Sequence, residues 1–142
     1  MQQEIIHKEI DLIQAIITRM ANNSFLLKGW LVSLIAVILA LNKDSLLQPN
    51  NVNLYFILII PVFIFWYLDA YFLQIERRYR ELYKWVIKNR SATNEHLFDL
   101  NHKRFKKDVA NIFGVMFSET LIVFYLLPLL FLIFLILKNK IF

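Results

Sequence analysis

Apolar residues occur along this chain in three long runs that are separated by polar stretches. The runs cover residues 25–41, 54–73 and 115–137, and each is close to the about 20 residues that a helix needs to cross a bilayer. None of them alternates strictly between apolar and polar residues, as a strand of a membrane barrel would. Because a segment in lipid must satisfy its own backbone hydrogen bonds, each run predicts a transmembrane helix.

A second pattern, with apolar residues spaced alternately by three and four, lies beside the first two runs. Before the first run and after the second, the series consists of Ile6, Ile10, Ile13, Ile17, Met20 and of Phe72, Ile75, Tyr79, Leu82, Val86. Such seams are typical of helices that pack side by side. One helix approaches the membrane and the other leaves it, so we expect them to pair antiparallel. A seam that one chain leaves partly uncovered also predicts a homo-oligomer.

A further amphipathic helix is expected over residues 95–113, after a turn at residues 90–94, with Phe98, Phe105 and Val109 on one face. The predicted fold class is all-α: an integral membrane protein with about three transmembrane helices and an amphipathic helical bundle on the cytoplasmic side. Its predicted parts are a cytoplasmic amphipathic helix at 1–24, transmembrane helix 1 at 25–41, a periplasmic loop at 42–53, transmembrane helix 2 at 54–73, a basic cytoplasmic helical hairpin at 74–114, transmembrane helix 3 at 115–137 and a periplasmic tail at 138–142.

Composition supports the membrane assignment and argues against an enzyme. Hydrophobic residues make up 58% of the 142 residues and charged residues only 19%, which is more apolar surface than a soluble domain of this size can bury. The chain has no Cys, and it contains no HExxH, GxSxG or glycine-rich phosphate loop. The three His residues are scattered. We therefore predict no catalytic residue, no metal site and no cofactor.

The distribution of Lys and Arg predicts the orientation. Ten of the sixteen lie between residues 74 and 114, and Lys8, Arg19 and Lys28 fall on the same side if there are three spans. Lys and Arg collect in cytoplasmic segments, so we expect a bacterial inner-membrane protein with a cytoplasmic N-terminus and a periplasmic C-terminus. The net charge of +5 then needs no nucleic acid to explain it. The first apolar run starts only at Phe25, which indicates a retained span rather than a cleaved signal peptide.

Three ionisable residues, Lys28, Asp69 and Glu119, lie within or at the edge of the apolar runs. Their positions are roughly 20, 22 and 27 Å from the outer ends of their spans, all toward the cytoplasmic leaflet. One hypothesis places Asp69 or Glu119 in a carboxylate ring around a pore that favours cations. The alternative is a Lys28–Asp69 ion pair that serves packing, with Glu119 at the interface. Pro61 and Pro128 are gate candidates, although prolines in membrane helices often have no gating role.

Basic residues of the predicted hairpin are candidates for contact with a lipid, a nucleotide or a partner protein. They are Arg77, Arg78, Arg80, Lys103, Arg104, Lys106 and Lys107. Anionic lipid and membrane topology explain such a cluster by themselves. Direct nucleic-acid binding stays open, because aromatic residues such as Tyr79, Trp85 and Phe105 can stack on bases. At helical spacing, however, aromatic residues are more typical of a core.

Two stretches carry a resemblance to a known family: the residues from Asn22 to Trp30, and the residues from Phe65 to Tyr83, which include FWYLDAYFL and ERRYRELY. The chain resembles the small membrane effectors of Hailong-type anti-phage defence loci, which are encoded beside nucleotidyltransferases. The resemblance implies a homo-oligomeric, tetrameric ion channel that its partner nucleotidyltransferase holds shut. Infection would open the channel, depolarise the cell and arrest growth. No family motif is specific enough to assign a role to a single residue.

The sequence thus predicts an oligomeric channel that is regulated through its cytoplasmic helices. A membrane anchor or adaptor that recruits a cytosolic protein and conducts nothing is the alternative. A small transporter is less favoured, because the spans have no clear polar site at the midplane.

Overall fold

The computed structural model describes residues 2–41 and 52–141, and all regular structure in these two ranges is helical. The elements are α1 (Gln2–Leu41), α3 (Val52–Asn89), the 3₁₀ helix η1 (His102–Phe105), α4 (Ile112–Met116) and α5 (Glu119–Ile141). Three helices of this part of the chain, α1, α3 and α5, are long and apolar enough to cross a membrane. The predicted loop at 42–53 lies almost entirely outside the described residues. The predicted all-α membrane fold is confirmed.

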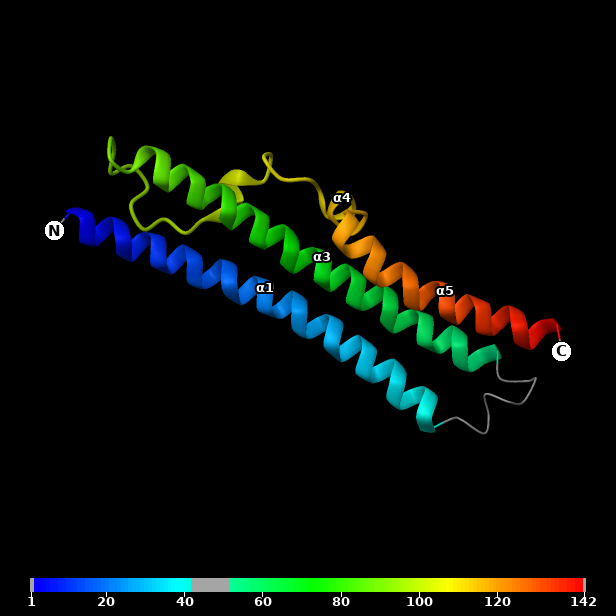
Figure 1. Ribbon diagram of the computed structural model, residues 1–142. Coiled ribbons are helices and arrows are strands. Elements are labelled where there is room, and N and C mark those ends of the chain that lie inside the picture. The colour runs from blue at the N-terminus through cyan, green and yellow to red at the C-terminus, as the bar shows by residue number, and fades with distance from the viewer. Residues whose placement is uncertain (1, 42–51, 142) are drawn as a thin grey trace.

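Helices α1 and α3 are much longer than a membrane is thick. They contain 40 and 38 residues and therefore extend about 60 and 57 Å, against a hydrocarbon core of roughly 30 Å. The predicted amphipathic helix at 1–24 and the first span form one uninterrupted helix, and so do the second span and the first half of the basic segment. Figure 1 shows both helices running the length of the molecule.

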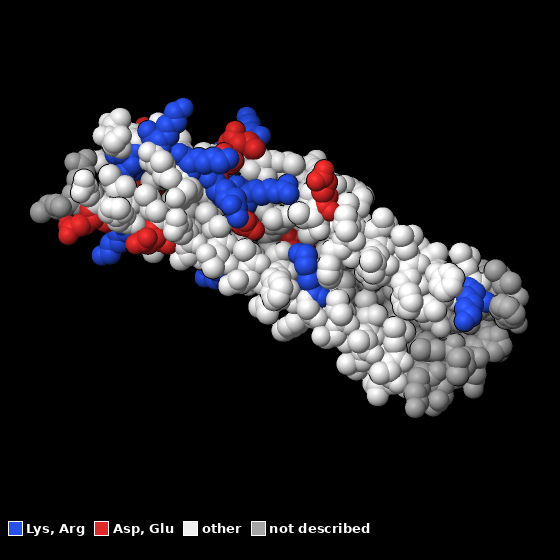
Figure 2. Space-filling model, viewed as in Figure 1, with Lys and Arg blue, Asp and Glu red and all other residues white. Residues whose placement is uncertain are grey.

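Helix α3 is the central element. It packs against α1 on one side and against α5 on the other, whereas the backbones of α1 and α5 do not approach each other in the described residues. Figure 2 shows that Lys, Arg, Asp and Glu gather over the half that holds the N-terminus, while few of them appear on this face of the half that holds the C-terminus. We call these the basic half and the apolar half.

Each half has its own core. In the apolar half, buried residues from all three long helices form one cluster, with Leu31, Leu58 and Tyr125 among its fully buried members. In the basic half, Ile13 of α1 packs against Leu82 and Val86 of α3. These residues belong to the two seams that the sequence showed. The predicted antiparallel pairing of these two helices is therefore confirmed.

The helix predicted over residues 95–113 is wrong. Residues 90–101 form turns and extended segments, followed by η1 and by the five residues of α4. His96 and Phe98 have φ angles of 56° and 57°, in the left-handed region that a right-handed helix cannot contain. Polar side chains bind the local backbone instead: Thr93 accepts a hydrogen bond from the amide of Glu95, and Asp99 accepts one from the amide of Asn101. Such bonds compete directly with helix formation.

The third span also begins later than expected. Residues 115–137 were predicted as one helix, but α4 ends at Met116 and α5 begins at Glu119. The break lies at Ser118, whose carbonyl accepts hydrogen bonds from the amides of Leu121 and Ile122. The Ser118 hydroxyl turns back to the carbonyl of Val115 at 2.6 Å. Glu119 therefore stands in the first turn of α5, where the helix dipole favours a carboxylate.

Candidate functional site: a buried polar cluster between the two halves

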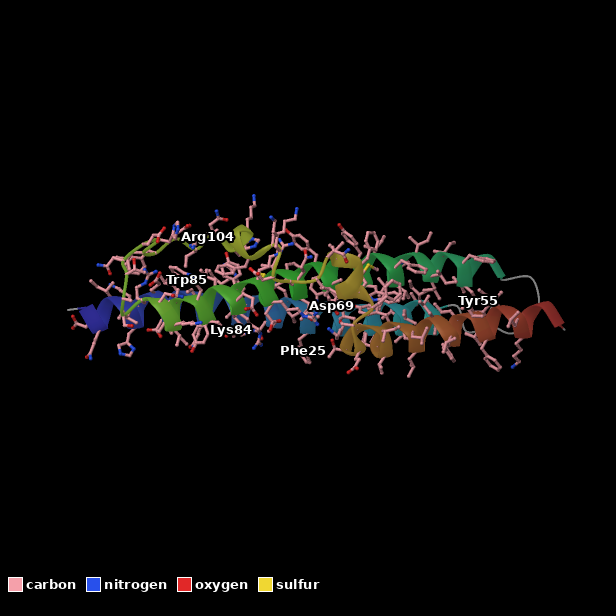
Figure 3. All side chains as sticks on the ribbon, turned by 90° about the horizontal axis from the view of Figure 1, so that it is seen from above. Phe25, Tyr55, Asp69, Lys84, Trp85 and Arg104 are labelled. Atoms are coloured by element: carbon pink, nitrogen blue, oxygen red, sulfur yellow. The ribbon has the colours of Figure 1, made fainter. Side chains whose placement is uncertain are left out.

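The three long helices meet in a polar cluster where the apolar half joins the basic half. Asp69 of α3 is fully buried, and its carboxylate lies 2.5 Å from the ammonium of Lys28 on α1. The hydroxyl of Ser24 donates to the other carboxylate oxygen, and the hydroxyl of Tyr125 on α5 donates to Asp69 at 2.9 Å. Figure 3 places Asp69 near the middle of the molecule's length.

Local helix geometry explains how the cluster forms. Ser24 and Lys28 are four residues apart and share one face of α1, and the Lys28 ammonium donates to the Ser24 hydroxyl at 2.9 Å. A tyrosine side chain in a helix points back toward the helix N-terminus, which brings the hydroxyl of Tyr125 to Asp69. Its oxygen also lies 3.3 Å from the carbonyl of Phe65, one turn earlier on α3.

The cluster neutralises the Asp69 carboxylate and satisfies its capacity for hydrogen bonds, so that its burial is less costly. A carboxylate at membrane depth needs a counter-ion and hydrogen-bond donors, and Asp69 has an ammonium and two hydroxyl groups. The side chain of Lys28 keeps 24% of its surface exposed, so the ammonium is at the edge of the cluster and Asp69 is at its centre. Chemically the arrangement is a closed ion pair that fastens α1, α3 and α5 together.

The predicted ion pair of Lys28 and Asp69 is thus present, and Glu119 is not part of it. Glu119 is exposed at the start of α5. The carboxylate of Asp69 is bound within its own chain, so in this conformation it is not free to line a pore. Ser24 and Tyr125 were missed by the sequence reasoning. The spacing of Ser24 and Lys28 was a usable signal, whereas nothing marked Tyr125 within its apolar run.

The two proline candidates lie within α3 and α5, which continue on both sides of Pro61 and Pro128. Both are partly buried. The backbone carbonyl four residues before each one loses its helical donor. The structure shows one conformation, and the gate hypothesis stays a prediction.

A second buried ion pair, which the sequence reasoning did not find, closes the far end of the basic half. The guanidinium of Arg90, directly after α3, makes two hydrogen bonds of 2.6 Å to the carboxylate of Glu9 on α1. Arg90 is 2% exposed and Glu9 is 1% exposed. Arg90 also donates to the carbonyls of Thr93, Glu95 and His96. We call this arrangement the Glu9–Arg90 clasp.

The predicted contact residues fall into two groups. Arg80 is paired with Glu76 at 2.7 Å, and the guanidinium of Arg104 lies 4.9 Å from the centre of the Trp85 ring, as Figure 3 illustrates. The other five predicted residues lie around η1 and the adjacent part of α3, and within the described residues none of them forms an ion pair: Arg77, Arg78, Lys103, Lys106 and Lys107.

The aromatic residues considered for base stacking are part of the core of the basic half. Tyr79, Tyr83, Trp85 and Phe105 all pack around Ile13, Leu82 and Val86. The ring of His102 lies 5.1 Å from that of Tyr79, and its burial, reinforced by Arg78 and Lys103 beside it, lowers the pKa of this imidazole. These rings stabilise η1 against α3.

Comparisons of the chain with protein-family models, with curated proteins and with solved structures find no match. In the described ranges, no group of three or more His, Asp or Glu side chains is arranged to hold a metal ion. The distinctive features of the chain are therefore the apolar helices, the two buried ion pairs and the basic surface.

Proposed function

We propose that the chain is the subunit of a homo-oligomeric ion channel in the bacterial inner membrane, with the basic half in the cytoplasm. The continuity of α1 and α3 carries the proposal: both helices run uninterrupted from the apolar half into the basic half. Packed helices move as stiff units. A force applied to the basic half would therefore act directly on the membrane spans, through the buried Lys28–Asp69 pair at the junction.

Several chains are needed to enclose a pore. Helices α1 and α5 both pack on α3, and their backbones do not approach each other in the described residues, so the helices of a single chain do not form a closed ring around a pore. Large apolar side chains are exposed on all three helices, among them Trp30 at 67%, Ile60 at 59% and Leu127 at 71%. In an oligomer, some of these faces would pack against neighbouring subunits and the others would contact lipid. Four subunits is the number that the resemblance implies.

We further propose that a cytosolic partner, a nucleotidyltransferase as in Hailong-type loci, binds the basic half and holds the channel shut. The exposed ammonium groups of Lys103, Lys106 and Lys107 suit an acidic surface, and complementary charge promotes both specificity and rapid association. Loss of this contact during phage infection would open the channel and depolarise the cell.

Conductance of the purified full chain in planar bilayers tests the channel directly. We expect a cation-selective current, because the exposed Glu119 would form a ring of carboxylates near the pore entrance. Glu119→Gln should shift the reversal potential toward the value of a pore that does not distinguish cations from anions. Glu95→Gln removes the same charge from an exposed position in the turn region and should leave the potential unchanged. Absence of any current from the unbound chain would contradict the proposal.

A membrane adaptor is the second candidate, and one observation favours it. The apolar half has no Asp, Glu, Lys or Arg within residues 29–41, 54–68 and 120–137, so a pathway through this region would be lined by apolar and uncharged side chains. A membrane-potential dye in cells that express the chain alone separates the two functions. A channel depolarises the cells, whereas an adaptor leaves the potential intact.

A further inference from the structure

A groove of about 400 Å³ opens between α3 and the segment that leads into α4. On the α3 side it is lined by Tyr67, Tyr71, Gln74 and Arg78, which follow one another along one face of the helix. From Tyr67 to Arg78 this face extends about 16 Å. The groove therefore crosses the level at which the apolar run of α3 gives way to charged residues.

The composition of the groove changes along its length. Its apolar end has the rings of Tyr67 and Tyr71, which are 48% and 45% exposed. Its polar end has the guanidinium of Arg78 and, from the opposite wall, the ammonium of Lys106. Tyrosine favours the membrane–water interface, where its ring is in the apolar layer and its hydroxyl reaches water. The groove thus matches the polarity of an anionic phospholipid: its apolar end suits the acyl chains, and its cationic end suits the phosphate.

The polar end has a hydrogen-bond donor without a partner. The Nε atom of Arg78 is buried and makes no hydrogen bond in the described residues. Arg80, two residues later, differs in this respect, because its Nε atom donates to the carboxylate of Glu76 at 2.8 Å. A buried donor without an acceptor is costly. A shift of the Arg78 side chain would bring this donor to an anionic oxygen in the groove.

The walls of the groove are fixed in place. The side-chain amide of Gln74, which is 7% exposed, donates to the carbonyl of Ala110 at 2.8 Å. The side chain of Asn111 is held by the amide of Gly114 at 2.8 Å. The segment that bears Lys106 is therefore tied to α3 on the membrane side of Arg78. Arg78 and Lys106 both line the groove between these walls.

We infer that this groove binds the headgroup of an anionic phospholipid. The phosphate would lie between Arg78 and Lys106 and would accept charge-assisted hydrogen bonds, which are stronger than those between neutral groups. The glycerol and the first acyl carbons would lie along Tyr71 and Tyr67. The site is independent of channel activity, because an adaptor with the same groove would bind the same lipid. It differs from general attraction to an anionic membrane in depending on two particular cations.

Native mass spectrometry of the full chain in detergent, titrated with phosphatidylglycerol or phosphatidylcholine, tests the site. We expect the wild-type chain to retain phosphatidylglycerol preferentially. A hydrogen bond to a charged group contributes about ten-fold or more to affinity, so the double variant Arg78→Gln with Lys106→Gln should lose about 100-fold or more. The double variant Arg77→Gln with Lys107→Gln removes the same charge from neighbouring positions outside the groove and should keep the preference.

Equal losses in the two double variants would overturn the inference, because general electrostatic attraction would then explain the binding. Absence of a preference for phosphatidylglycerol in the wild-type chain would also overturn it. Inorganic phosphate and glycerol phosphate distinguish the source of the anion: displacement of the lipid by either at equal concentration would show that the ligand is a soluble phosphate. Lys106 is exposed, so Lys106→Gln alone, with an expected loss of about ten-fold, keeps the test valid if the double variant fails to fold.

Discussion

The Glu9–Arg90 clasp gives the sharpest prediction about stability. Arg90→Ala removes both hydrogen bonds of 2.6 Å to Glu9 and leaves a carboxylate that is 1% exposed without a counter-ion. Removing one partner of a buried ion pair costs about 3–5 kcal/mol. Lys84→Ala is the control, because Lys84 also pairs with a glutamate, Glu81, but the two side chains are 68% and 32% exposed. An exposed pair contributes only about 0–1 kcal/mol.

Amide hydrogen exchange on the full chain in detergent micelles is the appropriate assay, because the clasp acts locally. The amide of Phe98 donates to Glu9 at 3.1 Å and therefore reports on the clasp directly. If this amide exchanges by local opening, a loss of 3–5 kcal/mol in Arg90→Ala accelerates its exchange by about 10²- to 10³-fold or more. Lys84→Ala should change it by less than about ten-fold. Similar rates in the two variants would refute the reasoning.

A double variant separates the ion pair from the other bonds of Arg90. Glu9→Leu with Arg90→Met leaves no buried charge, and replacement of a buried pair by apolar residues is often neutral or stabilising. The packing of α1 on α3 should then recover, as measured by exchange of the amides around Ile13 and Val86. The amide of Phe98 should stay fast, because its acceptor is gone. Recovery of Phe98 as well would show that the clasp does not hold the turn region.

Three further predictions concern the polar cluster and the surface of the basic half. Lys28→Met leaves Asp69 without a counter-ion, so the thermal stability in detergent should fall by several kcal/mol, and Asp69→Leu in the same chain should restore much of it. Tyr125→Phe removes one hydrogen bond to a carboxylate and should cost about 1.5–3 kcal/mol in the same melting experiment. The pKa of His102, lowered by burial, should appear below 6.5 in an NMR titration. The unfolded chain binds this proton first, so the stability that the neutral ring contributes is present above about pH 6.5 and is lost as the pH falls through the folded pKa.

The spans and the pairing of α1 with α3 were predictable because they depend on repetition. Apolar runs and seams with spacings of three and four recur over many residues, and burial of such faces is nearly independent of detail. Ile13, Leu82 and Val86 were named from spacing alone and are buried in the structure. A prediction of this kind needs no knowledge of which residues lie opposite each other.

The region after Arg90 was not predictable from the same pattern. Phe98, Phe105 and Val109 have roughly helical spacing, but hydrogen bonds from outside the segment decide its shape. Arg90 takes the carbonyls of Glu95 and His96, which a helix would need for its own bonds. Short polar side chains at Thr93, Asp99, Asn101 and Asn111 then each bind the nearby backbone. These residue types favour turns and helix caps, and their number in this segment argues against a continuous helix.

The candidate site was only half predictable for a related reason. Charged residues are rare inside apolar runs, so Lys28 and Asp69 can be recognised from the sequence. Glu9 and Arg90 are 81 residues apart in polar sequence, where charged residues are common and give no signal. Their burial follows from the register of α1 against α3, which neither helix shows by itself. Long-range pairs of this kind become visible only in the folded chain.

The two ion pairs together fix this register. The seam of α1 repeats after seven residues, since Ile6 and Ile10 are followed by Ile13 and Ile17, so apolar packing alone would tolerate a slip of one heptad along α3. Such a slip would break both the Glu9–Arg90 and Lys28–Asp69 pairs, at about 3–5 kcal/mol each. Helices α1 and α3 therefore behave as one locked unit. If the chain forms the proposed channel, the movement that opens its pore would occur between this unit and α5, or between subunits.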